Sequence, residues 1–494
     1  MPERRYREVQ SRSQFALFPP SMDDYVSGDN PVRAIDAFVD TLDLESLGFG
    51  HAEAYGGAGQ PAYDPGLLLK LYLYGYQHGV RSSRRLEAET RRNLEVIWLC
   101  RGAAPSYKTI ADFRKDNAPA LRSANREFVL LCRELSLLGG GRVAVDGTFM
   151  KADASLDGIH TGAGLEKDLK RLDERIAAYH RRLDEADAAP EDGDAEPELA
   201  AKMKALLEKR EHREALRERL LESGAGQVSE VDPDARLLNK GGGTVGGYNC
   251  QIAVDGKHKL IVAEDVVQDG NDARRLEPML TRAAAAVGNG KLTGLADTGY
   301  CAGEQLKACE DKGMDVYAPL PERAARKGVD GRFGSDDFQY EAEDDAHICP
   351  AGRLLTRSGS SSVMGGRRYF AYVPVAGACR DCPLSARCLP PKSATRKVFR
   401  WEHADVVDRH REKMGGAAAA KLMRERAALV EHPFGTIKRW AGMDHFLMRG
   451  LDKCRGEFGL MTLGYNFKRV VNELGADALA AHCLRKRGAT AALA

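Results

Sequence analysis

The sequence has no long apolar run and no excess of charge of either sign. No segment approaches the ~18 consecutive apolar residues of a membrane-spanning helix, so no membrane partner is expected. The first ten residues, MPERRYREVQ, lack the apolar stretch of a secretory signal, which predicts a cytoplasmic protein. The 73 lysines and arginines nearly balance the 72 aspartates and glutamates, giving a formal net charge of +1. Binding to a polyanion would therefore depend on local basic clusters.

The chain is long enough for several domains with cores of their own. At ~150 residues per domain its length predicts roughly three domains, and 43% of its 494 residues are apolar. Eleven cysteines in a cytosolic chain of this length indicate free thiols and a possible metal site rather than disulfides.

Two aspartates follow short apolar segments that have the character of strands. Asp146 stands in GRVAVDG and Asp297 in KLTGLADTGY, each at or near the end of a run rich in Val and Leu. Carboxylates at the carboxyl ends of strands face the crevice in which α/β proteins carry out chemistry. A hairpin turn is the alternative, because Asp-Gly is a common turn signal. The turn is favoured at Asp255, where AVDG recurs between two strand-like segments.

A third carboxylate lies in the octet EHPFGTIK, which runs from Glu431 to Lys438 in a helical context. Seven residues at ~100° each return to one face of an α-helix, so Glu431 and Lys438 are predicted to share a face. Three carboxylates gathered from distant segments would repel one another unless cations neutralised them, and oxygen ligands favour Mg2+ or Mn2+. Asp146, Asp297 and Glu431 together predict a metal-dependent phosphoryl-transfer site.

The order of these motifs closely resembles that of bacterial insertion-sequence transposases of the DDE class, whose catalytic core is ribonuclease H-like. The matching segments are AVDGTFMKADAS, GYNCQIAVD, LADTGY and VEHPFGTIKRW, and the resemblance covers nearly the whole chain. It is strongest to the subfamily with a cysteine-bearing insertion before the Glu helix. One departure is Met423, which stands where that family often carries a Tyr, while Arg426 fills the position of its Arg. The Tyr is auxiliary, so its loss is expected to affect efficiency more than chemistry.

The resemblance implies an enzyme that nicks DNA at the ends of an insertion sequence and joins the freed 3'-hydroxyl to target DNA. Asp146, Asp297 and Glu431 would hold two metal ions ~4 Å apart, and Lys438 would bind a phosphate near the scissile bond. The partners would be double-stranded DNA, as terminal inverted repeats and as target, and further copies of the chain in a homodimer or larger assembly on DNA. The protein would be nucleoid-associated when bound. A nuclease of the same fold that only hydrolyses nucleic acid, or a non-catalytic DNA-binding protein, remains an alternative.

The expected fold class is α/β, with a ribonuclease H-like mixed sheet as the core. An all-helical N-terminal domain, a helical-hairpin insertion and a cysteine-rich insertion would be added to it. The expected boundaries are 1–140 for the helical, DNA-end-binding domain, 141–159 and 236–334 for the first parts of the core, 160–235 for the helical hairpin, 335–400 for the cysteine-rich insertion, 401–475 for the Glu helix and the end of the core, and 476–494 for a tail.

Local patterns predict the two helical parts. The hairpin follows from a heptad seam at Leu165, Leu169, Leu172, Ile176, Tyr179 and Leu183. In the N-terminal domain, a capped helix from PSYKTIADFRKDN follows a short turn, which is compatible with a DNA-binding helix-turn-helix or with an ordinary bundle. Basic residues of this helix and of the surroundings of Glu431 are candidates for phosphate contacts: Lys108, Arg114, Lys115, Arg426, Arg439, Arg449, Lys453 and Arg455.

Four cysteines form the second distinctive pattern. Cys349 is followed by the cluster CRDCPLSARC, which contains Cys379, Cys382 and Cys388. Four thiolates with this spacing can hold a structural Zn2+ or, as the less favoured choice, a four-iron iron-sulfur cluster; unligated thiols are the other alternative. The metal would fold a segment expected to be too polar and glycine-rich to bury a core of its own.

Overall fold

The computed structural model describes residues 21–53, 61–187, 195–321, 331–390 and 392–491. The chain divides into two compact units. The helical unit comprises Met1–Cys132 and Thr436–Ala494, and the sheet unit comprises Arg133–Gly435. None of the helices within the described ranges is long and apolar enough to cross a membrane.

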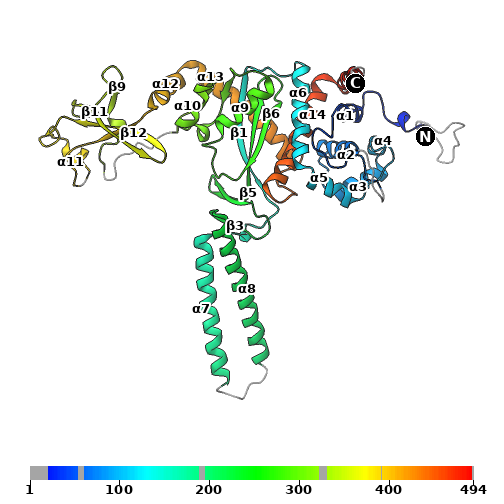
Figure 1. Ribbon diagram of the computed structural model, residues 1–494, viewed down its shortest axis with the longest axis horizontal. Coiled ribbons are helices and arrows are strands. Elements are labelled where there is room, and N and C mark those ends of the chain that lie inside the picture. Colours follow the sequence, from blue (N-terminus) through cyan, green and yellow to red (C-terminus); the bar gives the residue numbers. More distant parts are fainter. Residues whose placement is uncertain (1–20, 54–60, 188–194, 322–330, 391, 492–494) are drawn as a thin grey trace, which may run out of the picture. The chain divides into compact units, whose positions relative to one another are not determined.

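The described part of the helical unit contains helices from both ends of the sequence (Figure 1). In order they are η1 (Met22–Tyr25), α1 (Pro31–Val39), α2 (Pro65–Gln77), α3 (Ser83–Arg92), α4 (Leu94–Leu99), α5 (Tyr107–Asp116), α6 (Ala118–Glu134), α14 (Leu451–Leu474) and α15 (Ala476–Ala491). Side chains cap two of them: Asn30 accepts from the Val32 amide, and in the capped helix expected from PSYKTIADFRKDN, Ser106 accepts from the Thr109 amide. Such caps satisfy amides that have no partner within the helix.

The long helix α14 is packed into this unit along most of its length. It contacts α2, α5 and α15, and Phe467 stacks on Phe128 of α6. Gly456 faces Ala118 so closely that a Cβ at Gly456 would lie 2.6 Å from the Ala118 Cβ, which is why the two backbones need a glycine there. Residues 436–475 were expected to complete the sheet core; instead they group with the N-terminal helices because α14 buries its surface against them.

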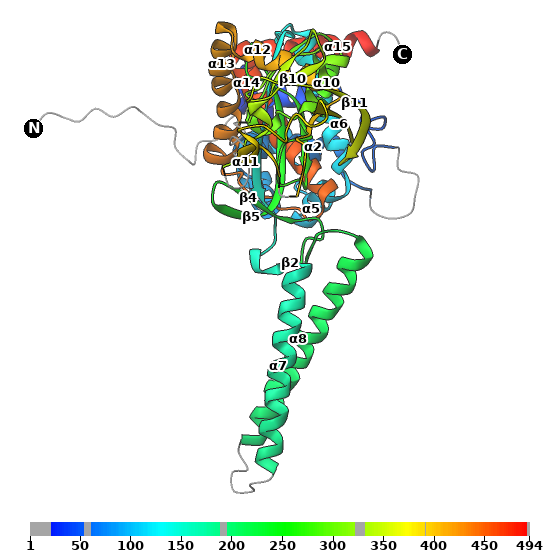
Figure 2. The same ribbon diagram turned by 90° about the vertical axis from the view of Figure 1, so that its left-hand side faces the viewer.

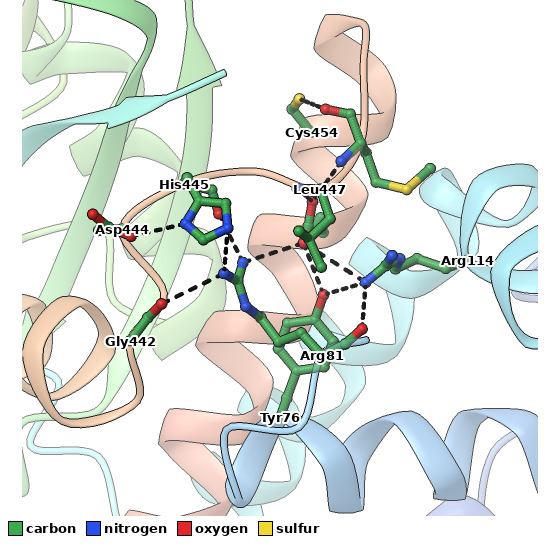
Figure 3. Close-up of polar contacts among 10 residues, drawn as sticks. Tyr76, Arg81, Arg114, Gly442, Asp444, His445, Leu447 and Cys454 are labelled. Carbon is green, nitrogen blue, oxygen red and sulfur yellow. Dashed lines mark hydrogen bonds and ion pairs between the residues drawn. The ribbon is translucent and has the colours of Figure 1, made fainter. Parts of the chain in front are cut away.

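A buried carboxylate ties together four segments of the helical unit (Figure 3). Glu457 of α14 has no exposed surface. Its Oε1 lies 3.5 Å from an Arg81 nitrogen and 3.7 Å from an Arg114 nitrogen, and it accepts from the Tyr76 hydroxyl at 3.1 Å. Its Oε2 accepts from the backbone amides of Leu447 and Met448 at 2.9 and 3.1 Å. A buried carboxylate with this many donors fixes the positions of its partners.

The sheet unit is built around a mixed six-stranded sheet. The strands are β1 (Arg142–Lys151), β4 (Arg236–Lys240), β5 (Gly243–Asp255), β6 (Ile261–Val267), β7 (Thr293–Leu295) and β8 (Asp315–Tyr317). Strand β1 is central: it pairs antiparallel with β5 and parallel with β7, while β6 pairs antiparallel with β5 and β8 parallel with β7. Antiparallel strands followed by the parallel pair β7 and β8 is the order that the ribonuclease H-like resemblance implies. The mixed α/β fold with a helical N-terminal region is thus confirmed.

Helices cover this sheet. Helix α9 (Leu276–Val287) packs on β6, β1 and β5, and α13 (Ala417–Phe434) packs against β1, β5, β7 and β8. Helix α10 (Gly303–Asp311) contacts β8, α9 and α12 (Ala404–Met414). At the β5–β6 turn, Asp255 is fully buried and accepts from the amides of Gly139, Gly140 and Lys257. The turn predicted at Asp255 is confirmed, and its carboxylate also anchors the glycine run before β1.

The charged insertion forms two long helices, α7 (Gly162–Asp187) and α8 (Ala195–Ser223), which lie side by side (Figures 1 and 2). The heptad residues Leu165, Leu169 and Leu172 are buried, whereas Ile176 and Tyr179 are partly exposed; the side chain of Leu183 lies outside the described part. The short strands β2 (Ile159–Thr161) and β3 (Gln227–Ser229) pair at the base of these helices.

The cysteine-rich insertion has a sheet of its own, with the strand order β13-β12-β11-β10-β9. Its elements are η4 (Ser335–Asp337), β9 (Gln339–Glu341), β10 (Ala346–Ile348), β11 (Leu354–Met364), β12 (Arg367–Pro374), α11 (Ser385–Cys388) and β13 (Val398–Trp401). Phe338, Leu355, Tyr372 and Val398 form a buried cluster in it. The expectation that this segment has no core was wrong, because strand pairing brings apolar side chains together, as it does Tyr372 and Val398.

Candidate active site

Asp146 and Asp297 are brought together by the register of two parallel strands. Ala144 of β1 pairs with Leu295 of β7, and each aspartate follows two residues later. Neighbouring strands lie ~4.8 Å apart, so the two carboxylates leave the sheet next to each other. Asp146 lies within β1 rather than at its end, but the pairing with β7 stops at Ala144, which opens the space beside it.

A guanidinium group joins this aspartate pair. The Arg426 Nη2 on α13 lies 2.9 Å from Asp146 Oδ1 and 3.6 Å from Asp297 Oδ2. The two carboxylate oxygens are therefore no farther apart than the sum of those distances. The exposed fractions of the side chains are 16% for Arg426, 20% for Asp146 and 38% for Asp297. Arg426 thus faces the aspartates in the sheet unit, not an open surface.

A polar network that the sequence did not reveal lies beside the pair. The Asp272 Oδ1, in the loop before α9, accepts from Gln251 Nε2 at 2.7 Å and from Asn249 Nδ2 at 2.8 Å. Gln251 Oε1 in turn accepts from the hydroxyl of Tyr300. Asn249 and Gln251 are fully buried in β5. The available signal was two amide side chains within an otherwise apolar strand, since buried amides need hydrogen-bond partners.

The pKa of Tyr300 shows that its hydroxyl lies near several charged side chains of the site. Burial raises the pKa of its hydroxyl well above its usual range, and the carboxylates of Asp272, Asp146 and Asp297 raise it further, while Arg426 opposes them. Tyr300 ends the short turn η3 (Thr298–Tyr300), whose first amides are capped by Asp297: Asp297 Oδ1 accepts from the Gly299 amide at 2.9 Å. The turn therefore fixes Asp297 and Tyr300 together.

The positions of Glu431 and Lys438 differ from the shared helical face expected from the sequence. Glu431 is exposed near the end of α13, and within the described part of the chain its side chain makes no hydrogen bond or ion pair. An α-helix turns about 140° over the five residues from Arg426, so the two side chains lie on different faces. From Gly435 to Trp440 the helix is a π-helix. Its wider turn ends the α-helical spacing, so the expectation that Lys438 returns to the face of Glu431 does not apply.

In the described ranges, no three Cys, His, Asp or Glu side chains are grouped closely enough to hold a metal ion as they stand. Even so, the aspartate pair suits a cation, because two carboxylate oxygens already converge on the single positively charged nitrogen of Arg426. Oxygen ligands of this kind match the preference of Mg2+ and Mn2+.

Two protein families match the chain. The family described as "Transposase domain (DUF772)" matches residues 20–116, within the helical unit. The family described as "Transposase DDE domain" matches residues 348–471, which include Arg426 and Glu431. The chain thus carries a transposase DDE domain, the domain of a catalytic transposase.

Other comparisons add little to the assignment. Among curated proteins none matches the transposase. A cryo-EM structure of the piggyBac transposase synaptic complex with hairpin DNA is similar at 9% identity, covering 92% of this chain and 79% of that chain, with a TM-score of 0.31. A TM-score this low does not establish a shared fold.

The basic residues predicted to contact DNA have different environments in the transposase. Arg114 is buried and belongs to the Glu457 network, so the prediction that it contacts DNA is wrong: its guanidinium is needed beside that carboxylate. Lys115 is half exposed near Asp112 and Asp116, and Arg455 lies 3.1 Å from Asp452. The remaining candidates outside α13 are exposed or partly exposed: Lys108, Lys438, Arg439, Arg449 and Lys453.

Cys349, Cys379, Cys382 and Cys388 line one cavity of the cysteine-rich sheet. Burial raises the pKa of the Cys388 thiol, Arg396 lowers it, and the other three thiols raise it again, so the four lie within electrostatic reach of one another. The Arg353 amide donates to the Cys349 sulfur at 3.4 Å. Thiols are the donors that Zn2+ favours, although these four are not grouped as a metal site in the described ranges.

Proposed function

We propose that this transposase binds the ends of an insertion sequence, nicks the DNA there and transfers the freed 3'-hydroxyl to target DNA. The observation that carries the proposal is the convergence of Asp146 and Asp297 on one cationic nitrogen, beside a helix of the DDE domain that also bears Glu431. Asp146 and Asp297 would hold Mg2+ or Mn2+, Glu431 would have to turn toward them to complete the set, and Lys438 would contact a phosphate.

The protein's own contribution would be to fix the positions of the charged side chains. The register of β1 and β7 sets the spacing of the two aspartates, and the cap on Gly299 prevents Asp297 from turning away. A bound divalent ion would activate the attacking water or 3'-hydroxyl and stabilise the leaving oxygen. Exposed lysines and arginines would hold the DNA backbone through phosphate contacts that weaken with salt. Pairing two DNA ends would require at least two copies of the chain.

The test is cleavage and strand transfer on a DNA duplex that carries the element's end, with Mg2+. Asp146→Asn, Asp297→Asn and Glu431→Gln should each abolish nicking while binding to the duplex persists, because each change removes charge but little volume. Asp157→Asn, an exposed aspartate of the same unit, should behave as wild type. Near-normal nicking by one of the three variants would remove that residue from the site. Nicking without joining to a target would favour the nuclease alternative.

We also propose that the four cysteines hold a structural metal, with Zn2+ favoured over an iron-sulfur cluster. Anaerobically purified protein should contain about one equivalent of zinc, or iron with sulfide. Cys382→Ser should release the metal, whereas Cys483→Ser, which changes a buried thiol in α15, should retain it. Absence of both metals, together with alkylation of all four thiols in the folded protein, would contradict the proposal.

A further inference from the structure

Arg426 was expected to contact DNA, but its surroundings indicate another role. Its guanidinium lies between two carboxylates that would otherwise repel each other across a partly buried site. Like charges held this close are costly unless a cation neutralises them. In the sheet unit the neutralising cation is a side chain of the protein itself.

The contacts of Arg426 are electrostatic rather than directional. Its Nε and Nη2 are shielded from solvent, yet neither makes a hydrogen bond of good geometry with a described residue. A guanidinium that belonged to a permanent structural pair would be expected to form parallel, well-aligned bonds with its carboxylate. Without such bonds, the guanidinium is held beside the two carboxylates by its charge.

We propose that Arg426 is the resident counter-cation of the aspartate pair, which keeps the metal-free site folded and withdraws when a divalent ion takes its place. This rests on the proposed function, since it requires that Asp146 and Asp297 are the metal ligands. The guanidinium and the ion approach the same carboxylate oxygens, so they compete for them. The metal ion binds the state in which Arg426 has left the carboxylates, so the free energy of the Arg426 interaction weakens metal binding.

Two consequences separate this role from DNA contact. Removing the guanidinium should destabilise the protein in the absence of metal, and it should strengthen metal binding because the competitor is gone. A residue that only contacts DNA phosphates would change neither quantity when DNA is absent.

The experiment uses the full chain without DNA. Thermal unfolding is followed in EDTA and over a Mg2+ titration for wild type, Arg426→Gln, Arg426→Lys and Arg424→Gln. Arg424 is exposed two residues away on α13 and serves as the matched control. Arg426→Gln should have a lower Tm in EDTA, regain it with Mg2+, and show half-saturation at about fivefold lower Mg2+, the factor expected for a modest ion pair. Arg426→Lys should retain most of the metal-free stability, and Arg424→Gln should match wild type.

The outcomes are distinguishable. If Arg426→Gln has wild-type Tm in EDTA, or binds Mg2+ no more tightly than wild type, the counter-cation role is overturned. If Arg426→Gln is unfolded in EDTA, recovery of cooperative unfolding on adding Mg2+ supports the role, and failure to recover overturns it. If Mg2+ stabilises wild type and Asp146→Asn, Asp297→Asn equally, the metal site itself is overturned, whatever Arg426 does.

Discussion

At the residue scale, the transposase site depends on a glycine, because it has no room for a Cβ at position 147. Gly147 follows Asp146 on β1, and a Cβ there would lie 2.3 Å from Gln251 Nε2 and 2.9 Å from both Asp272 Oδ1 and the Tyr300 hydroxyl. Only glycine lets the network of Gln251, Asp272 and Tyr300 close beneath the aspartate pair.

Gly147→Ala should therefore cost about 1–3 kcal/mol of stability, as overpacking of a fitted interior does, and should slow DNA nicking by displacing the network. Gly141→Ala is the matched control, because no atom lies within 4 Å of a Cβ at that position directly before the same strand. Urea unfolding and nicking rates would check both. Equal stability of the two variants would show that the network accommodates the added Cβ without loss of folding stability.

At the element scale, a salt-bridged glutamate fastens the base of the helical hairpin. Partial burial by itself would raise the pKa of Glu230, but hydrogen bonds from Arg213 and His160 and the charge of Arg213 lower it to about 2. Arg213 comes from α8 and His160 from β2, and both lie within 2.7 Å of the same Glu230 oxygen. Glu230 itself follows β3, so one carboxylate joins three elements.

Because the pKa of Glu230 is lowered in the folded state, its stabilising effect is present above its ordinary value of 4.5 and is lost as the pH falls toward 2. Glu230→Gln should destabilise the hairpin base by about 1 kcal/mol at pH 7, and the difference from wild type should vanish near pH 2. Glu222→Gln, at an exposed position of α8, should have no such dependence. Hydrogen exchange of β2 and β3 measured across this pH range would check the prediction, and a constant difference would contradict it.

Elements with local patterns were predictable from sequence, whereas those that depend on distant partners were not. The heptad leucines predicted the hairpin, and the Val- and Leu-rich segments predicted β1 and β7 with their aspartates. The strands of residues 339–401 were missed because Gly and Ser dilute the alternation in RSGSSSVMGGRR. Neither the Asp272 network nor the ion pairs of Glu457 could be predicted, since their partners meet only after folding. Arg114 looked like a surface cation for the same reason.

At the scale of the whole molecule, the Glu457 network joins helices that lie far apart in the sequence. Glu457→Gln would leave Arg81 and Arg114 buried beside a neutral group, so a loss of about 3–5 kcal/mol is expected. Glu473→Gln is the control: it lies on the same helix, pairs with Arg469 at 2.9 Å and is 32% exposed, so its effect should stay below ~1 kcal/mol. Hydrogen exchange of α2 and α5 would report the loss. Unchanged protection in Glu457→Gln would mean that the network is not what holds these helices.

The helical unit is made from both ends of the chain, and this sets an order of events during synthesis. Its N-terminal helices leave the ribosome first, but α14, which carries Glu457 and fills their shared interior, is translated only after the whole sheet unit. At 5–20 residues per second the delay is tens of seconds. During that time Arg81 and Arg114 cannot pair with the Glu457 carboxylate, while the sheet unit can already fold. The region that the Transposase domain family matches is thus made before the sheet unit and completed only after it.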